Sequence, residues 1–144
     1  MQIEYGAKYD RNLITTQIAA LIRLDVAKAT KTGDLPKGLK VSVKTRYYSG
    51  GSSIDLTIIA LPAEMVVINP EYVAARRRGL SADLHDAPML SEAVRTLTAR
   101  LDGMMQAYNY DGSDSRMDHF DVRFYGHCGV GAALKNKALN EAGL

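Results

Sequence analysis

Two runs of alternating side chains, separated by a glycine pair, constrain the fold of this chain more than any other feature. Apolar and polar residues alternate over positions 40–47 and again over positions 54–60. A period of two is typical of a strand with one buried and one exposed face. The Ser-Gly-Gly-Ser segment at 49–52 lies between the runs, and glycine tolerates the positive φ angles of a tight turn. The sequence therefore predicts a β-hairpin.

The hairpin also predicts a register. With Gly50 and Gly51 as the two loop residues, Arg46 lies opposite Asp55, an opposite-charge pair worth roughly 0.2–1 kcal/mol relative to alanines. The apolar rows of both strands then share one face, and a slip by one residue would mix the two faces. The polar row of the first strand carries three basic side chains: Lys40, Lys44 and Arg46. Tyr48 lies beside the turn.

Helical patterns fill much of the remaining chain. Apolar spacing predicts a helix over 17–31, with Thr15 or Thr16 capping its start and Gly33 at its end. The Asn69-Pro70-Glu71 segment indicates the start of a short helix that ends before Gly79. Two more helices are predicted, one from about Pro88 or Ser91 to Tyr108 and one from 132 to 141.

A last alternating run, residues 119–127, predicts another strand. Its expected outward-facing residues are His119, Asp121, Arg123, Tyr125 and His127. The order of elements is then helix, hairpin, two helices, strand, helix. This order favours an α+β fold, a small antiparallel sheet with helices packed on one face. With 144 residues, 47% of them hydrophobic, we expect a single domain over 1–144.

Composition excludes several classes of protein. A net charge of +2 gives no overall field that would select a nucleic acid or a membrane, so either partner would need a local patch. No apolar run approaches the roughly 20 residues of a transmembrane helix. We find no signal-peptide pattern at the start, and one cysteine, Cys128, fits a reducing compartment. We therefore expect a cytoplasmic protein, and the sequence leaves a homo-oligomer open.

Motifs for catalysis or metal binding are weak. The glycine pair lacks the spacing and lysine of a P-loop, and the acids at 111–121 do not follow a calcium-loop pattern. His119, His127 and Cys128 lack the paired spacings of a structural zinc site. We expect neither a metal nor a cofactor. If the protein is an enzyme, His119, Tyr125 and His127 are the candidate acid, base or hydrogen-bonding groups.

A binding surface has more support. Basic side chains interleaved with aromatic ones suit a nucleic-acid backbone and its bases. The predicted binding residues on and beside the sheet are Lys40, Lys44, Arg46, Tyr48, Arg123 and Tyr125, and Arg76, Arg77 and Arg78 form a second basic group. Both groups also have ordinary explanations, because half-exposed sheets carry basic residues and cations favour helix C-termini.

Several segments resemble one of the large polyvalent protein-associated domains of phages, plasmids and conjugative elements, of the family twenty-nine type. They are residues 9–13 (YDRNL), 15–19 (TTQIA), 39–43 (LKVSV), 48–56 (YSGGSSIDL), 108–111 (YNYD) and 118–125 (DHFDVRFY). The resemblance covers most of the chain. It implies residence in a mobile genetic element and supplies no catalytic residues.

The leading hypothesis from the sequence is a noncatalytic accessory binding protein of a mobile element. Its partner would be nucleic acid or a host defence protein, the latter in a counter-defence role. A small enzyme with a His/Tyr site on the exposed sheet face is the alternative.

Overall fold

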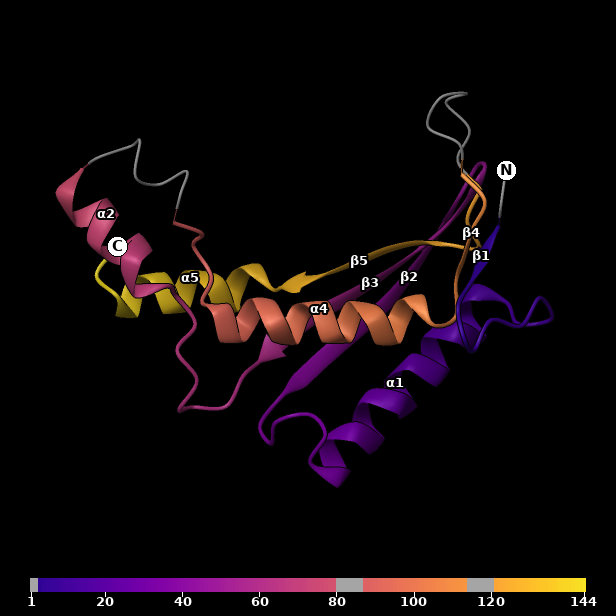
Figure 1. Cartoon of the computed structure of the whole chain (residues 1–144), viewed down its shortest axis with the longest axis horizontal. Coiled ribbons are helices and arrows are strands. Elements are labelled where there is room, and N and C mark those ends of the chain that lie inside the picture. Colours follow the sequence, from indigo (N-terminus) through magenta and orange to yellow (C-terminus); the bar gives the residue numbers. More distant parts are fainter. Residues whose placement is uncertain (1–2, 80–86, 114–120) are drawn as a thin grey trace.

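The computed structural model describes residues 3–79, 87–113 and 121–144. The elements are β1 (Glu4–Tyr5), α1 (Thr15–Thr32), β2 (Lys40–Tyr48), β3 (Gly51–Ala60), α2 (Pro70–Arg78), α4 (Glu92–Gln106), β4 (Tyr110–Asp111), β5 (Tyr125–Val130) and α5 (Ala132–Glu141). The α+β class is confirmed. Figure 1 shows α1 and α4 on one side of the long strands, with α2 and α5 at the end away from the hairpin turn.

The main sheet has three strands in the order β2-β3-β5. The predicted antiparallel hairpin of β2 and β3 is confirmed, whereas β5 pairs with β3 in parallel. A parallel neighbour requires a crossover, because the chain must return to the end where the first strand began. In this protein α4 makes the return, since it lies between β3 and β5 in the chain and runs along the sheet (Figure 1). β2 and β5 are therefore the two edge strands.

The predicted hairpin register is wrong by two residues. Tyr48 pairs with Gly51, so the loop residues are Ser49 and Gly50, and Gly50 has a φ of 92°. Gly51 lies in the ladder instead of in the turn. Lys44, and not Arg46, consequently lies opposite Asp55. A shift of two leaves every side chain on its predicted face, because strand side chains alternate with a period of two.

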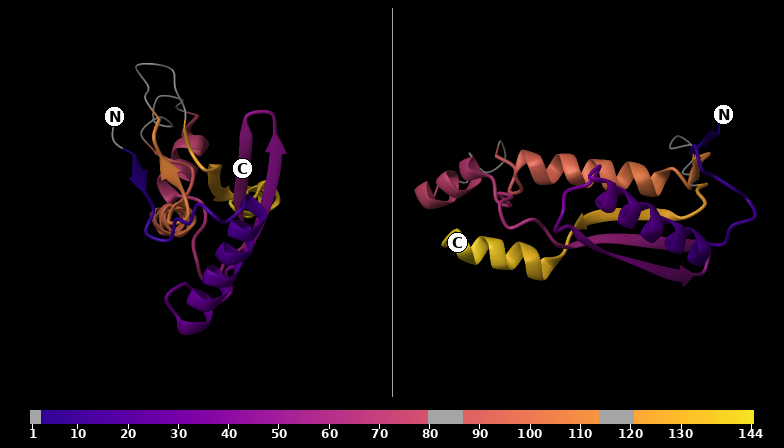
Figure 2. Two further views of the ribbon diagram at one scale, coloured as in Figure 1. Left: turned by 90° about the vertical axis from the view of Figure 1, so that its right-hand side faces the viewer. Right: turned by 90° about the horizontal axis from the view of Figure 1, so that it is seen from below.

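The core lies between the sheet and the layer of α1 and α4, as the two views of Figure 2 show. It is built from the apolar faces predicted for the hairpin and the long helices. Its fully buried members include Ile18, Ile22, Ile54, Leu56, Ile58, Leu101, Met105 and Phe124. Burial of each large side chain stabilises the fold by roughly 1.5–3 kcal/mol.

Gly126 leaves room on β5 for the ends of two side chains of α4. A Cβ atom at this position would lie 2.7 Å from Nε2 of Gln106 and 2.8 Å from Cε of Met105. Both atoms are the ends of flexible side chains, so a larger residue at this position would displace those side-chain ends.

The helix ends agree with the sequence except at the start of α1. Asn69 accepts a hydrogen bond from the Glu71 amide at the start of α2, and Gly33 ends α1 with a φ of 88°. The predicted threonine cap is wrong, because the Thr15 hydroxyl is buried and lies 2.7 Å from the Ser52 hydroxyl. That hydrogen bond ties the start of α1 to β3.

A second, two-stranded ribbon was not predicted. β1 pairs antiparallel with β4, with Glu4 opposite Asp111 and Tyr5 opposite Tyr110. The rings of Tyr5, Tyr9 and Tyr110 pack together, with centroids 5.2–6.2 Å apart. The ribbon lies at the end of the molecule that holds the hairpin turn (Figure 1).

Candidate binding surface

The sheet leaves one face uncovered by α1 and α4, and we call it the open face. Its residues alternate with the core residues of the same strands. Three rows cross it from β2 through β3 to β5: Arg46-Ser53-Tyr125, Lys44-Asp55-His127 and Ser42-Thr57-Gly129. Lys40 and Tyr48 extend the outermost strand at its two ends. The expected open sheet face is therefore present, and it carries five of the nine predicted binding residues, including Tyr125.

The basic side chains of the open face are available to a partner. Lys40, Lys44 and Arg46 are exposed on the edge strand. Among the residues that the structure describes, the one salt bridge joins Lys8 to Asp25, so none of the three forms a salt bridge there. Free cations on one side of a sheet can attract an anionic ligand.

Two tyrosine rings form a stacked pair on this face. Tyr48 and Tyr125 have ring centroids 6.4 Å apart and an interplanar angle of 30°. Tyr48 is 44% exposed and Tyr125 is 36% exposed, so both rings remain accessible to a ligand. Gly51 lies between them, and a Cβ there would meet both rings at 3.6–3.7 Å. A larger side chain at position 51 would separate the rings.

A shallow depression lies beside the rings. It has a volume of about 370 Å³, and its polar walls are Lys44, Asp55, Thr57 and His127. Asp55 lies between Lys44 and His127 in one row, so its carboxylate reduces the positive charge of the middle of the open face.

Arg123 does not belong to the open face, which corrects the prediction. It precedes β5, and its guanidinium donates a hydrogen bond to the carbonyl oxygen of Leu13 at the start of α1. Its backbone N–H is also held, by Oδ1 of Asn109 at 3.0 Å. The regular strand alternation starts only at Tyr125, so residues 121–124 do not follow the face rule.

The arginines of α2 form a separate basic region. Figures 1 and 2 show α2 at the end of the molecule opposite the hairpin turn. Arg76 donates a hydrogen bond to the Tyr72 hydroxyl at 3.2 Å, and Arg77 donates one to the Ala142 carbonyl at 2.9 Å. Arg76, Arg77 and Arg78 are thus not continuous with the open face. Arg77 connects α2 to the end of α5, while the Arg76 hydrogen bond lies within α2.

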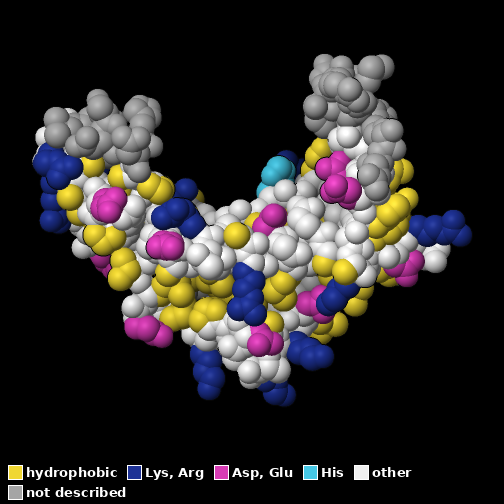
Figure 3. All heavy atoms as spheres, viewed as in Figure 1, with side chains coloured by type: hydrophobic (Ala, Val, Ile, Leu, Met, Phe, Trp, Pro, Cys, Tyr) yellow, Lys and Arg dark blue, Asp and Glu magenta, His cyan; other side chains and the backbone are white. Residues whose placement is uncertain are grey.

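The helical side of the molecule shows no comparable concentration of one charge. Figure 3 views this side, where Lys and Arg, Asp and Glu, and apolar side chains are interspersed over α1 and α4. On this side the charges of the two signs are therefore mixed.

The residues of the enzyme alternative are only partly brought together. His119 lies outside the described residues, while Tyr125 and His127 lie two positions apart on β5 and both face outward.

Cys128 faces α4 instead, with its Sγ 3.6 Å from the carbonyl oxygen of Thr98. Burial, with a smaller effect of Asp102, raises the pKa of this thiol to about 11, so it is a poor nucleophile at neutral pH. Within the described ranges no group of three or more potential ligands could hold a metal ion.

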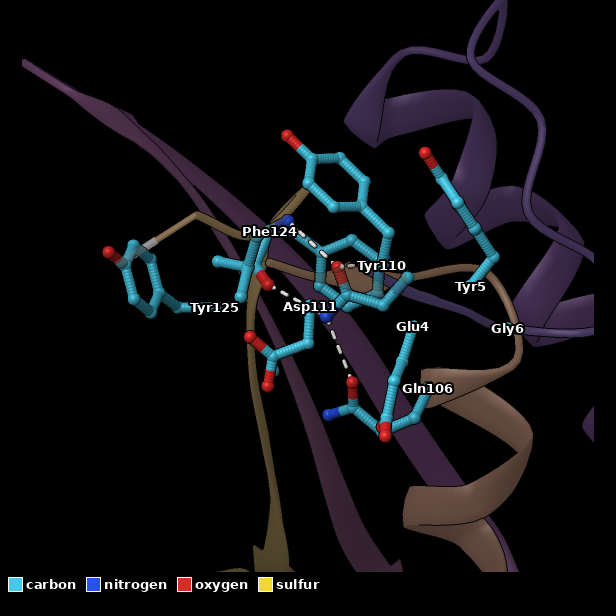
Figure 4. Close-up of a pocket in the computed structure, with 11 residues that line it drawn as sticks. Glu4, Tyr5, Gly6, Gln106, Tyr110, Asp111, Phe124 and Tyr125 are labelled. Carbon is cyan, nitrogen blue, oxygen red and sulfur yellow. Dashed lines mark hydrogen bonds between the residues drawn. The ribbon is translucent and has the colours of Figure 1, made fainter. Parts of the chain in front are cut away.

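A pocket adjoins the open face at the start of β5, and the sequence did not predict it. It has a volume of about 490 Å³ and is lined by residues of β1, β4, β5 and the end of α4. Tyr125 belongs to both the pocket and the stacked pair. Figure 4 shows Glu4 and Asp111 directed to the side of the ribbon that faces Gln106, with the Tyr5 and Tyr110 rings on the other side. No local pattern could have revealed this pocket, because it depends on the pairing of β1 with β4 across the whole chain.

Asn109 holds the walls of the pocket together. Its side-chain amide donates to Oε1 of Gln106 and to the Phe124 carbonyl, both at 2.9 Å. Its Oδ1 accepts hydrogen bonds from the backbone amides of Tyr110, Arg123 and Phe124 at 3.0–3.3 Å. Asn109 is buried, so its full set of hydrogen bonds fixes these walls relative to one another.

Among the described residues, no helix combines the length and the apolar character needed to cross a membrane. Comparison with protein-family models, with curated proteins and with solved structures finds no match to this chain.

Proposed function

We propose that this protein is a noncatalytic, single-stranded nucleic-acid binding protein and that the open face is its binding surface. The observation that carries the proposal is the exposed Tyr48–Tyr125 pair, which lies on the same face as Lys44 and Arg46. Rings that stack on bases and cations that contact phosphates are the two groups that such proteins combine.

The geometry favours single strands over duplexes. Stacking on a tyrosine requires a base whose π-face is free, and in a duplex the neighbouring base pairs cover that face. Each base stacked on a protein ring contributes about 1–3 kcal/mol. Lys44 and Arg46 lie two residues apart on one strand, which separates their Cα atoms by roughly 7 Å. That separation suits successive phosphates of an extended strand, because a nucleotide backbone has a repeat of similar length.

The setting of this activity is a further part of the proposal. The resemblance to polyvalent protein-associated domains suggests a phage, plasmid or conjugative element. Single-stranded DNA is an intermediate that a transferred element exposes, so a protein of this kind would protect or deliver it. We therefore favour nucleic acid over a host defence protein as the partner.

The test is a titration of labelled 12-nucleotide single strands, with a duplex of the same sequence alongside. Lys44→Ala and Arg46→Ala should each weaken binding. Because log K falls with log salt by about 0.7 for every phosphate contacted in a single strand, the double variant should have a slope smaller by about 1.4. Lys28→Ala is the matched control, since Lys28 is an exposed lysine on α1, on the covered side of the sheet.

Two results would contradict the proposal. One is a double variant with the affinity and salt slope of the wild type. The other is equal binding of duplex and single strand, because the stacked tyrosines would then have no role.

A further inference from the structure

The pocket next to Tyr125 continues the open face. A strand that stacks a base on Tyr125 would bring its next nucleotide to the mouth of the pocket, because Tyr125 lines both features. The pocket measures about 490 Å³, which is large enough for one nucleobase. Its lining includes Val122, a half-buried apolar residue, and Phe124, which is almost fully buried.

The polar groups of the pocket are mostly acceptors. Glu4 lies directly opposite Asp111 in the β1–β4 ribbon, so two carboxylates face the same space. Like charges in opposite positions of a ladder destabilise it. Neither carboxylate has a salt bridge among the described residues. A ligand that donates hydrogen bonds to both would relieve this repulsion, and a phosphate would increase it.

The Asp111 carboxylate is held in position beside the pocket. Asp111 Oδ1 accepts the Ser113 backbone N–H at 2.9 Å, and this hydrogen bond lowers the pKa of the Asp111 carboxyl, so the group is ionised at neutral pH. Gln106 supplies a hydrogen-bond donor to the pocket. Its Oε1 is occupied by Asn109, and its Nε2 is 3.5 Å from Asp102, which leaves that amide able to donate to a ligand.

We propose that the pocket receives one unstacked base of the bound strand and prefers a base with an exocyclic amino group. This inference rests on the proposed function. The two hydrogens of a cytosine N4 amino group can serve Glu4 and Asp111 together, and carboxylates are the acceptors that proteins use for this group. Uracil presents a single N–H between two carbonyl oxygens, which the carboxylates repel.

Binding of deoxycytidine and deoxyuridine 12-mers at pH 8 tests the inference, because the two bases differ at the C4 substituent and N3. The wild-type protein should bind the cytidine strand at least about 5-fold more tightly, the lower end of the discrimination that a well-matched base contact provides. The Glu4→Gln/Asp111→Asn double variant should lose this preference and bind the uridine strand as well as the wild type does, or better. Asparagine at 111 keeps an oxygen for the Ser113 amide, so the loop conformation is retained.

Glu64→Gln is the matched control, because Glu64 is an exposed acid outside the pocket, and it should keep the preference. If the wild type binds both strands equally, or if the double variant still prefers cytidine, the inference is wrong while the proposed function stands. If neither strand binds, the proposed function itself fails. Thermal unfolding of each variant distinguishes a lost preference from a lost fold.

Discussion

The ring of Tyr48 is stacked on the ring of Tyr125 with a centroid distance of 6.4 Å, although the two residues belong to the two edge strands of the sheet. The strand between them contributes Gly51, which has no side chain to separate the rings. The adjacent Tyr47 points to the other face, where its hydroxyl accepts a hydrogen bond from the Thr16 amide at 3.2 Å. Two neighbouring tyrosines thus have different roles.

Tyr48→Leu should lower the affinity for single-stranded DNA by about 5-fold or more, because one base loses a stacking partner worth about 1–3 kcal/mol. Fluorescence anisotropy with a labelled 12-mer measures the change. The stability of the fold should change little, since Tyr48 is 44% exposed.

The neighbouring Tyr47→Phe variant is the control for this prediction. It should bind DNA as the wild type does, while its free energy of unfolding falls by about 1 kcal/mol through the loss of one hydrogen bond. If Tyr47→Phe weakened binding and Tyr48→Leu did not, the wrong face of the hairpin would have been assigned.

Asp55→Asn should strengthen nucleic-acid binding. The Asp55 carboxylate lies between Lys44 and His127 on the open face, where it opposes the approach of phosphates. Asparagine removes the charge and keeps the size of the side chain. The gain should be largest at low salt and should decrease in 0.5 M salt, because the Debye length shortens from about 10 Å at 0.1 M.

Asp34→Asn is a suitable comparison for Asp55→Asn, since Asp34 is an exposed acid next to the end of α1 and away from the open face. A gain in affinity of the same size in both variants would indicate an effect of net charge alone.

Tyr108 makes the fold less stable as the pH rises into the alkaline range. Its hydroxyl donates a hydrogen bond to the Asp25 carboxylate, which also pairs with Lys8 at 3.1 Å. Burial, followed by the hydrogen bond and the charge of Asp25, raises the pKa of Tyr108 well above its ordinary value of 10. The unfolded chain loses this proton first, so the stabilisation is complete below pH 10 and decreases as the pH rises above it.

The expected loss from Tyr108 is at most about 1.4 kcal/mol per pH unit above pH 10, measured by urea unfolding between pH 8 and pH 11. Tyr108→Phe should be less stable at pH 8 by about 1.5–3 kcal/mol, because Asp25 loses a hydrogen bond, and its stability should fall less steeply above pH 10. Tyr110 adds to the wild-type slope in the same direction, since the hydrogen bond to Asp121 raises its pKa too. An identical slope in wild type and Tyr108→Phe would contradict the assignment.

Cys128 should react slowly with thiol reagents. Because its pKa is raised from 9.0 to about 11, the thiolate fraction at pH 8 is lower by about 100-fold than for an unperturbed thiol. The rate of iodoacetamide labelling in the folded protein, relative to the same chain in urea, measures this difference. Comparable rates in the two conditions would show that the thiol is not protected and would reopen a nucleophilic role for it.

The sequence by itself determined the elements whose signals are local. The hairpin strands and the terminal helix follow from the spacing of their side chains. The Asn69 cap and the proline after it follow from groups within one turn of each other. The faces of the hairpin were also predictable. They survive the two-residue error in register because alternation is preserved by an even shift.

Only the tertiary structure decided which of these surfaces work together. Three of the contacts join residues distant in the chain: the pairing of β5 with β3, the Arg123 contact with Leu13, and the ribbon of β1 with β4. The distance between α2 and the open face also follows from the overall fold. No spacing rule encodes such contacts, because their free energy depends on how α4 returns the chain across the sheet and on the packing of side chains from distant elements.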